Sequence, residues 1–397
     1  MASHPTYRSI ERWHQDLTVI RHTLHQHPEL GYEEEQTAAL VVRELQRYGV
    51  DEIHQGLGIT GVVGVIRGKG SGRPGRASVG LRADMDALPM QEDNEFAHRS
   101  TVPGKMHGCG HDGHTTMLLG AARHLAATRE FNGTVNLIFQ PGEEGHAGAK
   151  AMIEDGLFTR FACDAVFAMH NWPGLAAGKI AVRPGPVMAA ADRVRIDITG
   201  RGGHGAHAYL AVDPVVVAAH IITAVQSIVA RNVSPLDAAV VSLCAMQAGD
   251  MSAMSVIPQT ATLVGTVRTF RLETQDHVEA RLQALVESIA TGFGAKATLT
   301  FERIYPATVN TPVETEFAAN VARELVGDEN FVSDLEPSMG AEDFSFMLQQ
   351  RPGAYFRLGQ AGLPGGCFLH NTRYDFNDNI LPLGATLYAR LAERWLT

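Results

Sequence analysis

The sequence has few cysteines, no long apolar run and no apolar stretch near its first residue. Its four cysteines are scattered along the chain, at Cys109, Cys163, Cys244 and Cys367. They form no CxxC pair, which argues against a disulfide framework or a zinc knuckle and fits reduced thiols. No uninterrupted apolar run has the length of a membrane span. Residues 1–18 are polar and carry charges of both signs, so we expect no secretory signal and a cytoplasmic location.

Positive charge is in deficit, since 33 Lys and Arg face 43 Asp and Glu, for a net charge of −10. A nucleic acid or an anionic membrane surface requires a basic patch, so neither is an expected partner. Hydrophobic residues, in contrast, make up 45% of the 397 residues, which is enough for a sizeable core. The length exceeds that of a typical single domain and predicts two.

Hydrophobic patterning in the first part of the chain predicts strands that alternate with helices. The expected strands are 62–66, 77–83, 134–139 and 164–169, and the expected helices are 35–48, 117–127 and 147–155. A helix at 314–325, a strand at 355–358 and a closing helix at 383–395 follow near the end. This alternation predicts an α/β fold with a large, mostly parallel sheet flanked by helices.

The middle of the chain has a different order of elements. Expected strands at 193–199, 239–246, 261–270 and 296–302, with expected helices at 213–231 and 274–291, give the order β-α-β-β-α-β. That order is typical of small ferredoxin-like domains. We therefore expect a discontinuous catalytic domain at 1–186 and 304–397, interrupted by an inserted lid or dimerisation domain at 187–303.

Five short segments carry chemically active side chains at comparable places in this pattern. They are RADMDALPM (82–90), MHGCGHDGH (106–114), FQPGEEGHAG (139–148), AMHNW (168–172) and FLHNTRYDFND (368–378). The first, third and fourth directly follow apolar strands. Ligands of open α/β sheets bind outside the carboxyl ends of the strands, so these segments are expected to meet at one edge of the sheet.

The residue types in these segments suit a metal site. The candidate donors are Cys109, His111, Glu143, Glu144, His170 and His370. Thiolate, imidazole and carboxylate groups favour borderline ions such as zinc, cobalt, nickel or manganese over calcium or magnesium. There are more donors than one four-coordinate ion with an open position needs, which favours two ions about 3.5–4 Å apart.

These segments resemble the M20 family of metallopeptidases and amidohydrolases. The resemblance is strongest to the branch with hippurate hydrolase, auxin-conjugate (IAA-amino acid) hydrolases and N-acetyldiaminopimelate deacetylase. It covers essentially the whole chain, from RHTLHQHPELGYEEEQT (21–37) through GRGGHGAH (200–207) and GAEDFSFM (340–347) to HNTRYDFND (370–378). GCGHDGH and PGEEG together are its most specific motifs, and the expected order of domains is also the family's order.

The resemblance implies a role for each matching position. It implies two divalent metal ions per subunit, held by Cys109, His111, Glu144, His170 and His370. Glu143 would be the general base, and Asp86 would be the family's catalytic aspartate. His204 matches a histidine of the insert that reaches into an active site, in some relatives that of a partner subunit. The insert is the usual oligomerisation element, so the resemblance implies a homodimer or homotetramer.

Four further positions concern the substrate or the branch of the family. Ser255 stands where many relatives have an asparagine that lies in the substrate pocket, and Ala208 replaces a proline of the HGAHP pattern. Serine is shorter and cannot make the same pair of hydrogen bonds. Arg268 is a candidate for binding a substrate carboxylate, although a surface salt bridge explains it equally well. Asp84 falls where aminopeptidase relatives carry a metal-binding histidine, and its role is left open.

The expected function is hydrolysis of the amide bond of a small N-acyl-amino acid, either hippurate-like or N-acetylated, to a carboxylic acid and a free amino acid. N-acetyldiaminopimelate deacetylation and dipeptidase or carboxypeptidase activity are alternatives within the family. Asp84-Met85-Asp86 in place of His-x-Asp favours the amidohydrolase branch. A cysteine hydrolase with Cys109 as nucleophile leaves the other donors unused. A non-catalytic binding protein would be favoured by a missing base or ligand, and every such position is filled.

Overall fold

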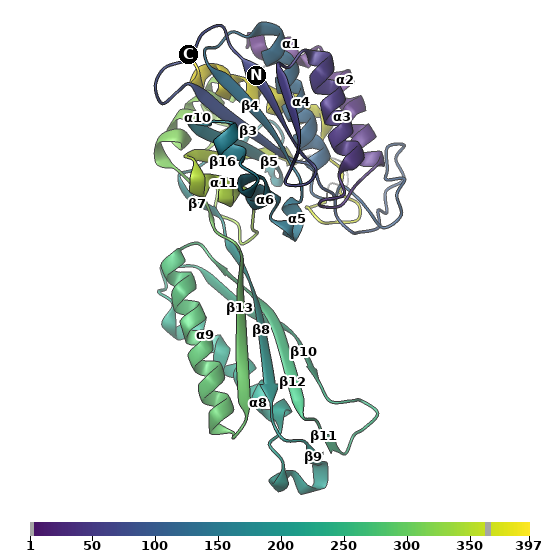
Figure 1. Ribbon diagram of the computed structural model, residues 1–397, viewed down its shortest axis with the longest axis vertical. Coiled ribbons are helices and arrows are strands. Elements are labelled where there is room, and N and C mark those ends of the chain that lie inside the picture. The colour runs from purple at the N-terminus through teal and green to yellow at the C-terminus, as the bar shows by residue number, and fades with distance from the viewer. Residues whose placement is uncertain (1–3, 362–366) are drawn as a thin grey trace. The chain divides into compact units, whose positions relative to one another are not determined.

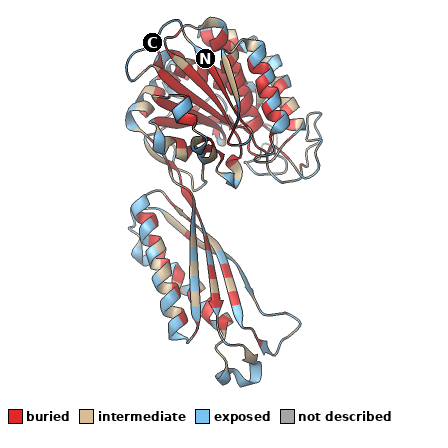
Figure 2. Ribbon diagram, viewed as in Figure 1, coloured by how far each residue is buried: buried red, intermediate tan, exposed pale blue. Residues whose placement is uncertain are grey.

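The computed structural model describes residues 4–361 and 367–397, and the chain divides into two compact units. Unit 1 comprises Met1–Val187, Val309–Glu336 and Asp343–Thr397, and unit 2 comprises Met188–Thr308 and Pro337–Glu342. Each unit has its own apolar core, made of side chains from its sheet and its helices. Figure 2 shows buried residues within both units. Unit 2 is therefore an insertion into the chain of unit 1.

Unit 1 is built on an eight-stranded sheet with the order β1-β2-β4-β3-β5-β16-β6-β15. Its strands are β1 (Glu52–Leu57), β2 (Gly61–Arg67), β3 (Ser78–Asp84), β4 (Thr134–Gln140), β5 (Ala165–Ala176), β6 (Ile180–Ala181), β15 (Phe331–Val332) and β16 (Gly353–Ala361). The central strands β4, β3, β5 and β16 are mutually parallel, whereas β1 and β2 join antiparallel at one end. Two short strands, β7 (Gly185–Met188) and β14 (Thr308–Asn310), pair separately.

Helices flank this sheet. They are α1 (Pro5–Glu11), α2 (His14–Gln26), α3 (Glu35–Tyr48), α4 (His111–Thr128), α5 (Glu143–His146), α6 (Gly148–Glu154), α7 (Leu157–Arg160), α10 (Pro312–Val326), α11 (Phe344–Gln350) and α12 (Leu381–Trp395), with two 3₁₀ turns, η3 (Asp328–Asn330) and η4 (Asp378–Ile380). α4 packs against α12 and β3, while α6 and α11 pack with β4 and β16 (Figure 1). The central strands are consequently buried, as Figure 2 shows.

The mixed α/β fold that the patterning predicts is confirmed. Some helices differ from the expected ones in their bounds or number. Helix α3 has the expected bounds and ends at Gly49, whose φ of +75° suits a residue without a side chain. Helix α4 begins at His111, on the N-terminal side of the apolar spacing at 117–127, and its polar HDGH stretch is buried and helical. α1 and α2, which precede the first expected helix, were not expected.

Unit 2 has the split β-α-β-β-α-β arrangement. Its strands are β8 (Ala190–Thr199), β9 (Gly203–His204), β10 (Ala239–Ala248), β11 (Val256–Ile257), β12 (Thr260–Thr269) and β13 (Lys296–Tyr305), and its helical segments are η1 (Gly205–Leu210), α8 (Pro214–Ser227), η2 (Ile228–Asn232) and α9 (Leu272–Gly292). The main sheet is antiparallel, with the order β10-β12-β8-β13. That strand order and the paired helices match the expected ferredoxin-like insert.

Helix α8 starts as expected from its sequence, because the Asp213 carboxylate accepts the backbone N–H of Val215 at 2.9 Å and Pro214 occupies the first turn. By length and composition alone, Pro214–Asn232 is apolar enough to cross a membrane, and 33% of its most apolar window is buried. The segment coincides with the helix expected at 213–231. In unit 2 it packs on β8, β10, β12 and α9.

Candidate metal centre

The sheet of unit 1 brings the five predicted metal ligands into one cluster. β5 carries His170, the turn after β4 carries Glu144, and the loop that opens α4 carries Cys109 and His111. Donor atoms of Cys109, His111 and His170 lie within 4.8 Å of one another, and so do those of Cys109, Glu144 and His370. Cys109 belongs to both groups, which makes the five side chains one continuous set of donors.

Distances between donor atoms show that the side chains of this cluster lie close together. Sγ of Cys109 lies 3.3 Å from Nε2 of His170, and Nε2 of His370 lies 3.1 Å from Oε1 of Glu144. His111 also groups with Glu143 and Glu144 within 4.8 Å. Soft and borderline donors therefore face one another from four separate chain segments, as a site for a zinc-like ion requires.

His111 shows that the cluster fits a cation. Its ring is fully buried, yet neither ring nitrogen has a hydrogen-bond partner. Nδ1 lies 3.3 Å from Oδ1 of Asp86, and Nε2 lies 3.8 Å from Oδ2 of Asp84. Buried polar groups normally have partners. An imidazole nitrogen that faces thiol and carboxylate donors without a hydrogen bond has the surroundings of a metal ligand.

The pKa values of Cys109 and His111 reflect an excess of negative charge in the cluster. Burial and the neighbouring carboxylates of Glu144 and Glu143 raise the pKa of the Cys109 thiol well above its ordinary value. Burial alone would lower the pKa of His111, but the carboxylates of Asp84 and Asp86 raise it to about 10. A divalent cation would offset this charge and favour the thiolate that binds metal.

Asp86 holds the turn that carries the two glutamates. Its Oδ1 accepts the backbone N–H of Glu143 at 3.0 Å, and its Oδ2 accepts that of Glu144 at 2.9 Å. Burial would raise the pKa of Asp86, but the ring of His111 and the two N–H groups lower it. Asp86 is thus an ionised carboxylate that contacts His111 on one side and the Glu143–Glu144 turn on the other.

The loop of His370 is attached to the loop of Cys109. The backbone N–H of His370 donates to the carbonyl of Gly108 at 2.8 Å. His370 has a φ of +60°, a left-handed conformation that costs a non-glycine residue about 1–3 kcal/mol and is concentrated at functional sites. Gly110, with a φ of +96°, leaves room for Asn171, because a Cβ there would lie 2.4 Å from its Oδ1.

The sequence motifs gave no role to His114, although it belongs to the MHGCGHDGH segment. Its Nδ1 lies 2.6 Å from Oδ1 of Asp84, and its Nε2 lies 2.6 Å from Oδ1 of Asn171. Asp84 also accepts a 2.7 Å hydrogen bond from Arg82. His114 follows His111 by three residues on α4, and this spacing, which places both rings on one helix face, was the available signal.

Arg82 and Asp343 extend the buried polar cluster behind the donors. Nη2 of Arg82 donates to Asp343 at 3.0 Å, and its Nε donates to Gln140 at 2.7 Å. Asp343 lies in GAEDFSFM, and its backbone N–H is 3.4 Å from Oε1 of Glu143. These contacts attach the C-terminal ends of β3 and β4 to the start of α11.

The remaining candidate residues all lie in unit 2. His204 is exposed on β9, opposite Val256 of β11, and its Nδ1 accepts the N–H of Ala206 at 3.1 Å. Ser255 is close to it, because its carbonyl accepts the N–H of Gly205 at 2.7 Å. Arg268 lies near the end of β12, and its guanidinium donates to the Val267 carbonyl at 3.0 Å. His204 and Ser255 therefore lie at the two-stranded sheet of β9 and β11, to which Arg268 does not belong.

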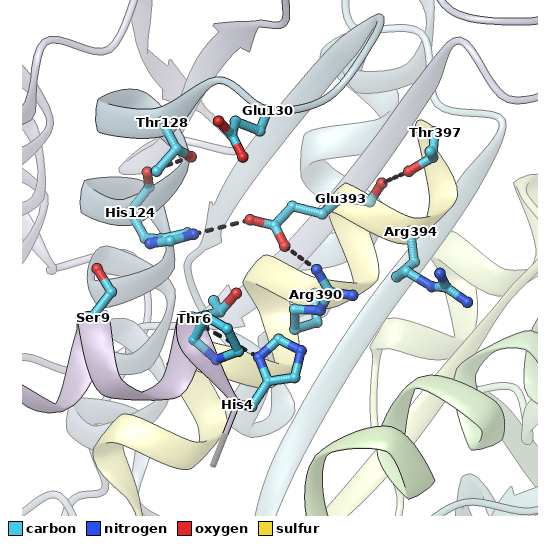
Figure 3. A pocket seen from close by; sticks show the side chains of 11 residues that line it. His4, Thr6, Ser9, His124, Thr128, Glu130, Arg390, Glu393, Arg394 and Thr397 are labelled. Carbon is cyan, nitrogen blue, oxygen red and sulfur yellow. Dashed lines mark hydrogen bonds and ion pairs between the residues drawn. The ribbon is translucent and has the colours of Figure 1, made fainter. Parts of the chain in front are cut away.

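A separate cavity of about 580 Å³ lies beside α1, α4 and α12, as Figure 3 shows. His124 points toward Glu393, with its Nε2 2.9 Å from the carboxylate, and Arg390 donates to the same carboxylate at 2.5 Å. None of the predicted ligands is among the described residues that line it. Because these charged side chains pair with one another, we do not include the cavity in the candidate site.

Comparison with known proteins identifies relatives over nearly the full length of the chain. The chain is 43% identical to a hippurate hydrolase of Campylobacter jejuni over 381 residues, covering 96% of this chain and 97% of the relative. It is 40% identical to an IAA-amino acid hydrolase of Arabidopsis thaliana, covering 96% of this chain and 86% of the relative.

A solved structure from Bacillus subtilis, described as a dinuclear metal-binding peptidase of the M20 family, superposes with a TM-score of 0.83 at 34% identity. It covers 97% of this chain and 99% of that chain. The model of peptidase family M20/M25/M40 matches residues 80–394, which include all five predicted ligands and Glu143. The chain therefore belongs to peptidase family M20/M25/M40, as its GCGHDGH and PGEEG motifs predict.

Proposed function

We propose that this enzyme hydrolyses the amide bond of N-acyl-amino acids and releases a carboxylic acid and a free amino acid. The observation that carries the proposal is the convergence of Cys109, His111, Glu144, His170 and His370 beside the carboxylate of Glu143. The relatives named hippurate hydrolase and IAA-amino acid hydrolase, at 43% and 40% identity, support this substrate class.

The five donors would hold two divalent ions, drawn from zinc, manganese, cobalt and nickel. Such ions polarise a carbonyl oxygen and lower the pKa of a bound water to about 7. Cys109 would contribute a thiolate and His111, His170 and His370 neutral rings, while Glu144 would contribute a carboxylate. Asp86 would keep His111 in orientation through the contact at Nδ1.

Glu143 is the residue that moves protons in this proposal. It is not among the five ligands, it is buried, and its backbone is held by Asp86. As general base its carboxylate would take a proton from the attacking water, and as general acid it would return that proton to the nitrogen of the leaving amine. Exclusion of bulk water around a buried carboxylate strengthens its electrostatic effect on the reacting groups.

Residues of unit 2 would complete recognition of the substrate. We propose that His204 stabilises the developing negative charge on the carbonyl oxygen, in its own or a partner subunit's site. Arg268 would bind the substrate carboxylate, and Ser255 would contact the substrate. Assembly as a homodimer or homotetramer through unit 2, in a reducing cytoplasmic location without nucleic-acid or membrane partners, belongs to the same proposal.

A carboxypeptidase activity is a second candidate at the same site. The chain is 38% identical to a thermostable carboxypeptidase of Saccharolobus solfataricus over 395 residues. A C-terminal peptide bond and an N-acyl-amino-acid bond are both amides next to a free carboxylate, so one set of groups would act on both. The ratio of turnover on an N-acyl-amino acid to that on a matched dipeptide distinguishes the two.

The test is hydrolysis of hippurate, N-acetylmethionine, N-acetyldiaminopimelate and indole-acetyl-alanine by metal-stripped enzyme and after addition of each ion. We expect loss of turnover on stripping and recovery with at least one ion. A cysteine hydrolase, with Cys109 as nucleophile, would keep its activity after chelation, which would overturn the proposal. No bound metal and no turnover with any of the four ions would also overturn it.

A further inference from the structure

Glu34, in the segment that leads into α3, is a fully buried carboxylate with both oxygens engaged. Its side chain has no exposed surface. Oε1 accepts the backbone N–H of Gly142 at 2.8 Å, and Oε2 accepts the hydroxyl of Thr60 at 2.6 Å. Glu34 therefore connects the start of α3 to the turn after β4, which carries the general base.

Glu34 and Asp86 together accept hydrogen bonds from three consecutive backbone N–H groups. The N–H of Gly142 goes to Glu34, and those of Glu143 and Glu144 go to Asp86. Gly142 precedes α5 with a φ of +55°, and the first N–H groups of a helix have no acceptor within that helix. A buried N–H that loses its acceptor is unfavourable, and the turn could avoid that cost by changing its conformation.

The segment of Glu34 also contacts the far end of the same turn. The hydroxyl of Tyr32 donates to the carbonyl of His146 at 2.8 Å. A Cβ on Gly31 would lie 2.6 Å from the His146 ring and 3.0 Å from Cα of Gly142, so the two backbones approach closely. Residues 31–34 thus bind the 142–146 turn at both ends, and Glu34 makes the bond next to Glu143.

We propose that Glu34 is a positioning residue for catalysis, which holds Glu143 at its working position by binding the preceding backbone N–H of Gly142. This inference rests on the proposed role of Glu143 as general base. The two hydrogen bonds of the Glu34 carboxylate go to Gly142 and Thr60, which are not among the five predicted ligands. Misplacement of a catalytic group by about 1 Å can cost about 10²-fold in rate, so loss of this bond should lower kcat.

The chain offers a matched control in the same segment. Glu29 also accepts two hydrogen bonds from the protein, from the backbone N–H groups of Gln36 and Thr37 at 3.0 and 2.8 Å. Its bonds stabilise the start of α3 and do not involve the 142–146 turn. Replacement of Glu29 by alanine therefore measures what it costs to remove a hydrogen-bonded carboxylate from this segment without touching Gly142.

The experiment compares kcat, KM and bound metal for wild type, Glu34→Ala, Glu34→Gln, Glu34→Asp and Glu29→Ala holoenzymes. We expect Glu34→Ala to lose about 10–100-fold in kcat, with KM and metal content close to wild type. Glu34→Gln keeps an acceptor oxygen at the same reach and should stay within about 3-fold of wild type. Glu34→Asp keeps the charge but is one methylene shorter, so it should lose about 5-fold or more.

The relative kcat values of these variants distinguish a positioning role of Glu34 from a general structural role. A kcat of Glu34→Ala equal to that of wild type would overturn the inference, and so would an equal loss in Glu29→Ala or a loss that tracks metal content. If Glu34→Ala does not fold, the Gln and Asp variants decide, because a role for charge alone predicts the reverse order. A better activity of Glu34→Asp than of Glu34→Gln would therefore also overturn it.

Amide hydrogen exchange keeps this inference separate from the proposed function, because it needs no substrate. Exchange of the Gly142 amide should be about 10-fold or more faster in Glu34→Ala or Glu34→Asp than in wild type, and unchanged in Glu29→Ala. If wild type hydrolyses no N-acyl-amino acid, the proposed function fails while exchange still tests the bond. If wild type is active and Gly142 exchanges at the wild-type rate in both variants, the inference fails while the function stands.

Discussion

The carboxylate of Asp86 accepts the backbone N–H of Glu143 at 3.0 Å, so a residue after β3 positions a residue after β4. The same carboxylate binds the N–H of Glu144 and contacts the ring of His111. An Asp86→Asn variant retains only one acceptor oxygen for these two N–H groups. We expect it to lose about 10–100-fold in metal affinity or turnover.

The measurement for Asp86→Asn is metal content by elemental analysis together with kcat on the best substrate of the panel. Asp93→Asn is the matched control, because Asp93 is exposed. Wild-type metal affinity and wild-type kcat in Asp86→Asn would contradict the assigned role.

Replacement of Glu143, the proposed base, should separate turnover from metal binding. Glu143 is not among the five predicted ligands, so Glu143→Ala should bind as much metal as wild type. Loss of general acid–base catalysis should lower kcat by about 10²–10⁴-fold. The check is a metal assay beside a rate assay on the same preparation, and a metal-free Glu143→Ala protein would mean that Glu143 is a ligand.

Arg21 should contribute strongly to the stability of unit 1. Its guanidinium has no exposed surface, donates to Asp378 at 2.7 Å and to Asp375 at 2.9 Å, and lies 3.6 Å from Asp112. Arg21→Ala would leave Asp112 buried without this cation, which typically costs about 3–5 kcal/mol.

The free energy of unfolding by urea tests this expectation, with Arg394→Ala as the control. Arg394 pairs with Glu324 at 2.9 Å on the surface, where such pairs contribute about 0–1 kcal/mol. Arg21→Lys should recover little of the loss, because an ammonium cannot make the same set of bonds. Equal stabilities of the two alanine variants would refute the structural role of Arg21.

Stability should depend on pH through Glu34. Burial, opposed by the hydrogen bond from Thr60 and reinforced by the charge of Asp86, raises the pKa of Glu34 from 4.5 to about 7. Between these two pH values the folded state holds a proton that the unfolded chain has released. The contribution of Glu34 to the free energy of unfolding therefore falls as the pH rises through this window.

Urea unfolding of metal-stripped wild type and Glu34→Gln at pH 5 and pH 8 checks this sign. The glutamine variant cannot ionise, so the stability of wild type relative to the variant should be lower at pH 8 than at pH 5. A difference that stays constant, or that moves the other way, would show that Glu34 has no raised pKa in the folded state.

Much of the fold followed from local patterns in the sequence. The apolar runs of β3 and β4 and the helical spacing of α3 predict those elements, and the change of rhythm after residue 186 predicts the insert. The apolar spacing of helix α4 covers only 117–127, whereas the helix begins at His111. Burial of His111, Asp112 and His114 in that helix depends on contacts with distant segments, which periodicity does not show.

Some residues of the candidate site could likewise be predicted from the sequence, and others could not. Side chains that follow strand ends, such as Glu143, Glu144 and His170, could be found from the sequence, because parallel strands bring their ends to one edge of a sheet. Glu34 and Arg82 gave no such signal. A glutamate in a run of three before a helix and an arginine within a strand are most often exposed residues, and only the fold shows that both Glu34 and Arg82 are buried.

The sequence by itself determined the α/β class, the inserted unit, the family and the residue types that meet at the sheet edge. These properties depend on hydrophobic period, turn residues and short motifs, all of which are local along the chain. Tertiary structure alone decided which side chains hold the 142–146 turn in place. Glu34 and Gly142 are 108 residues apart, and their hydrogen bond forms only because packing of α3 against the sheet brings the two backbones together.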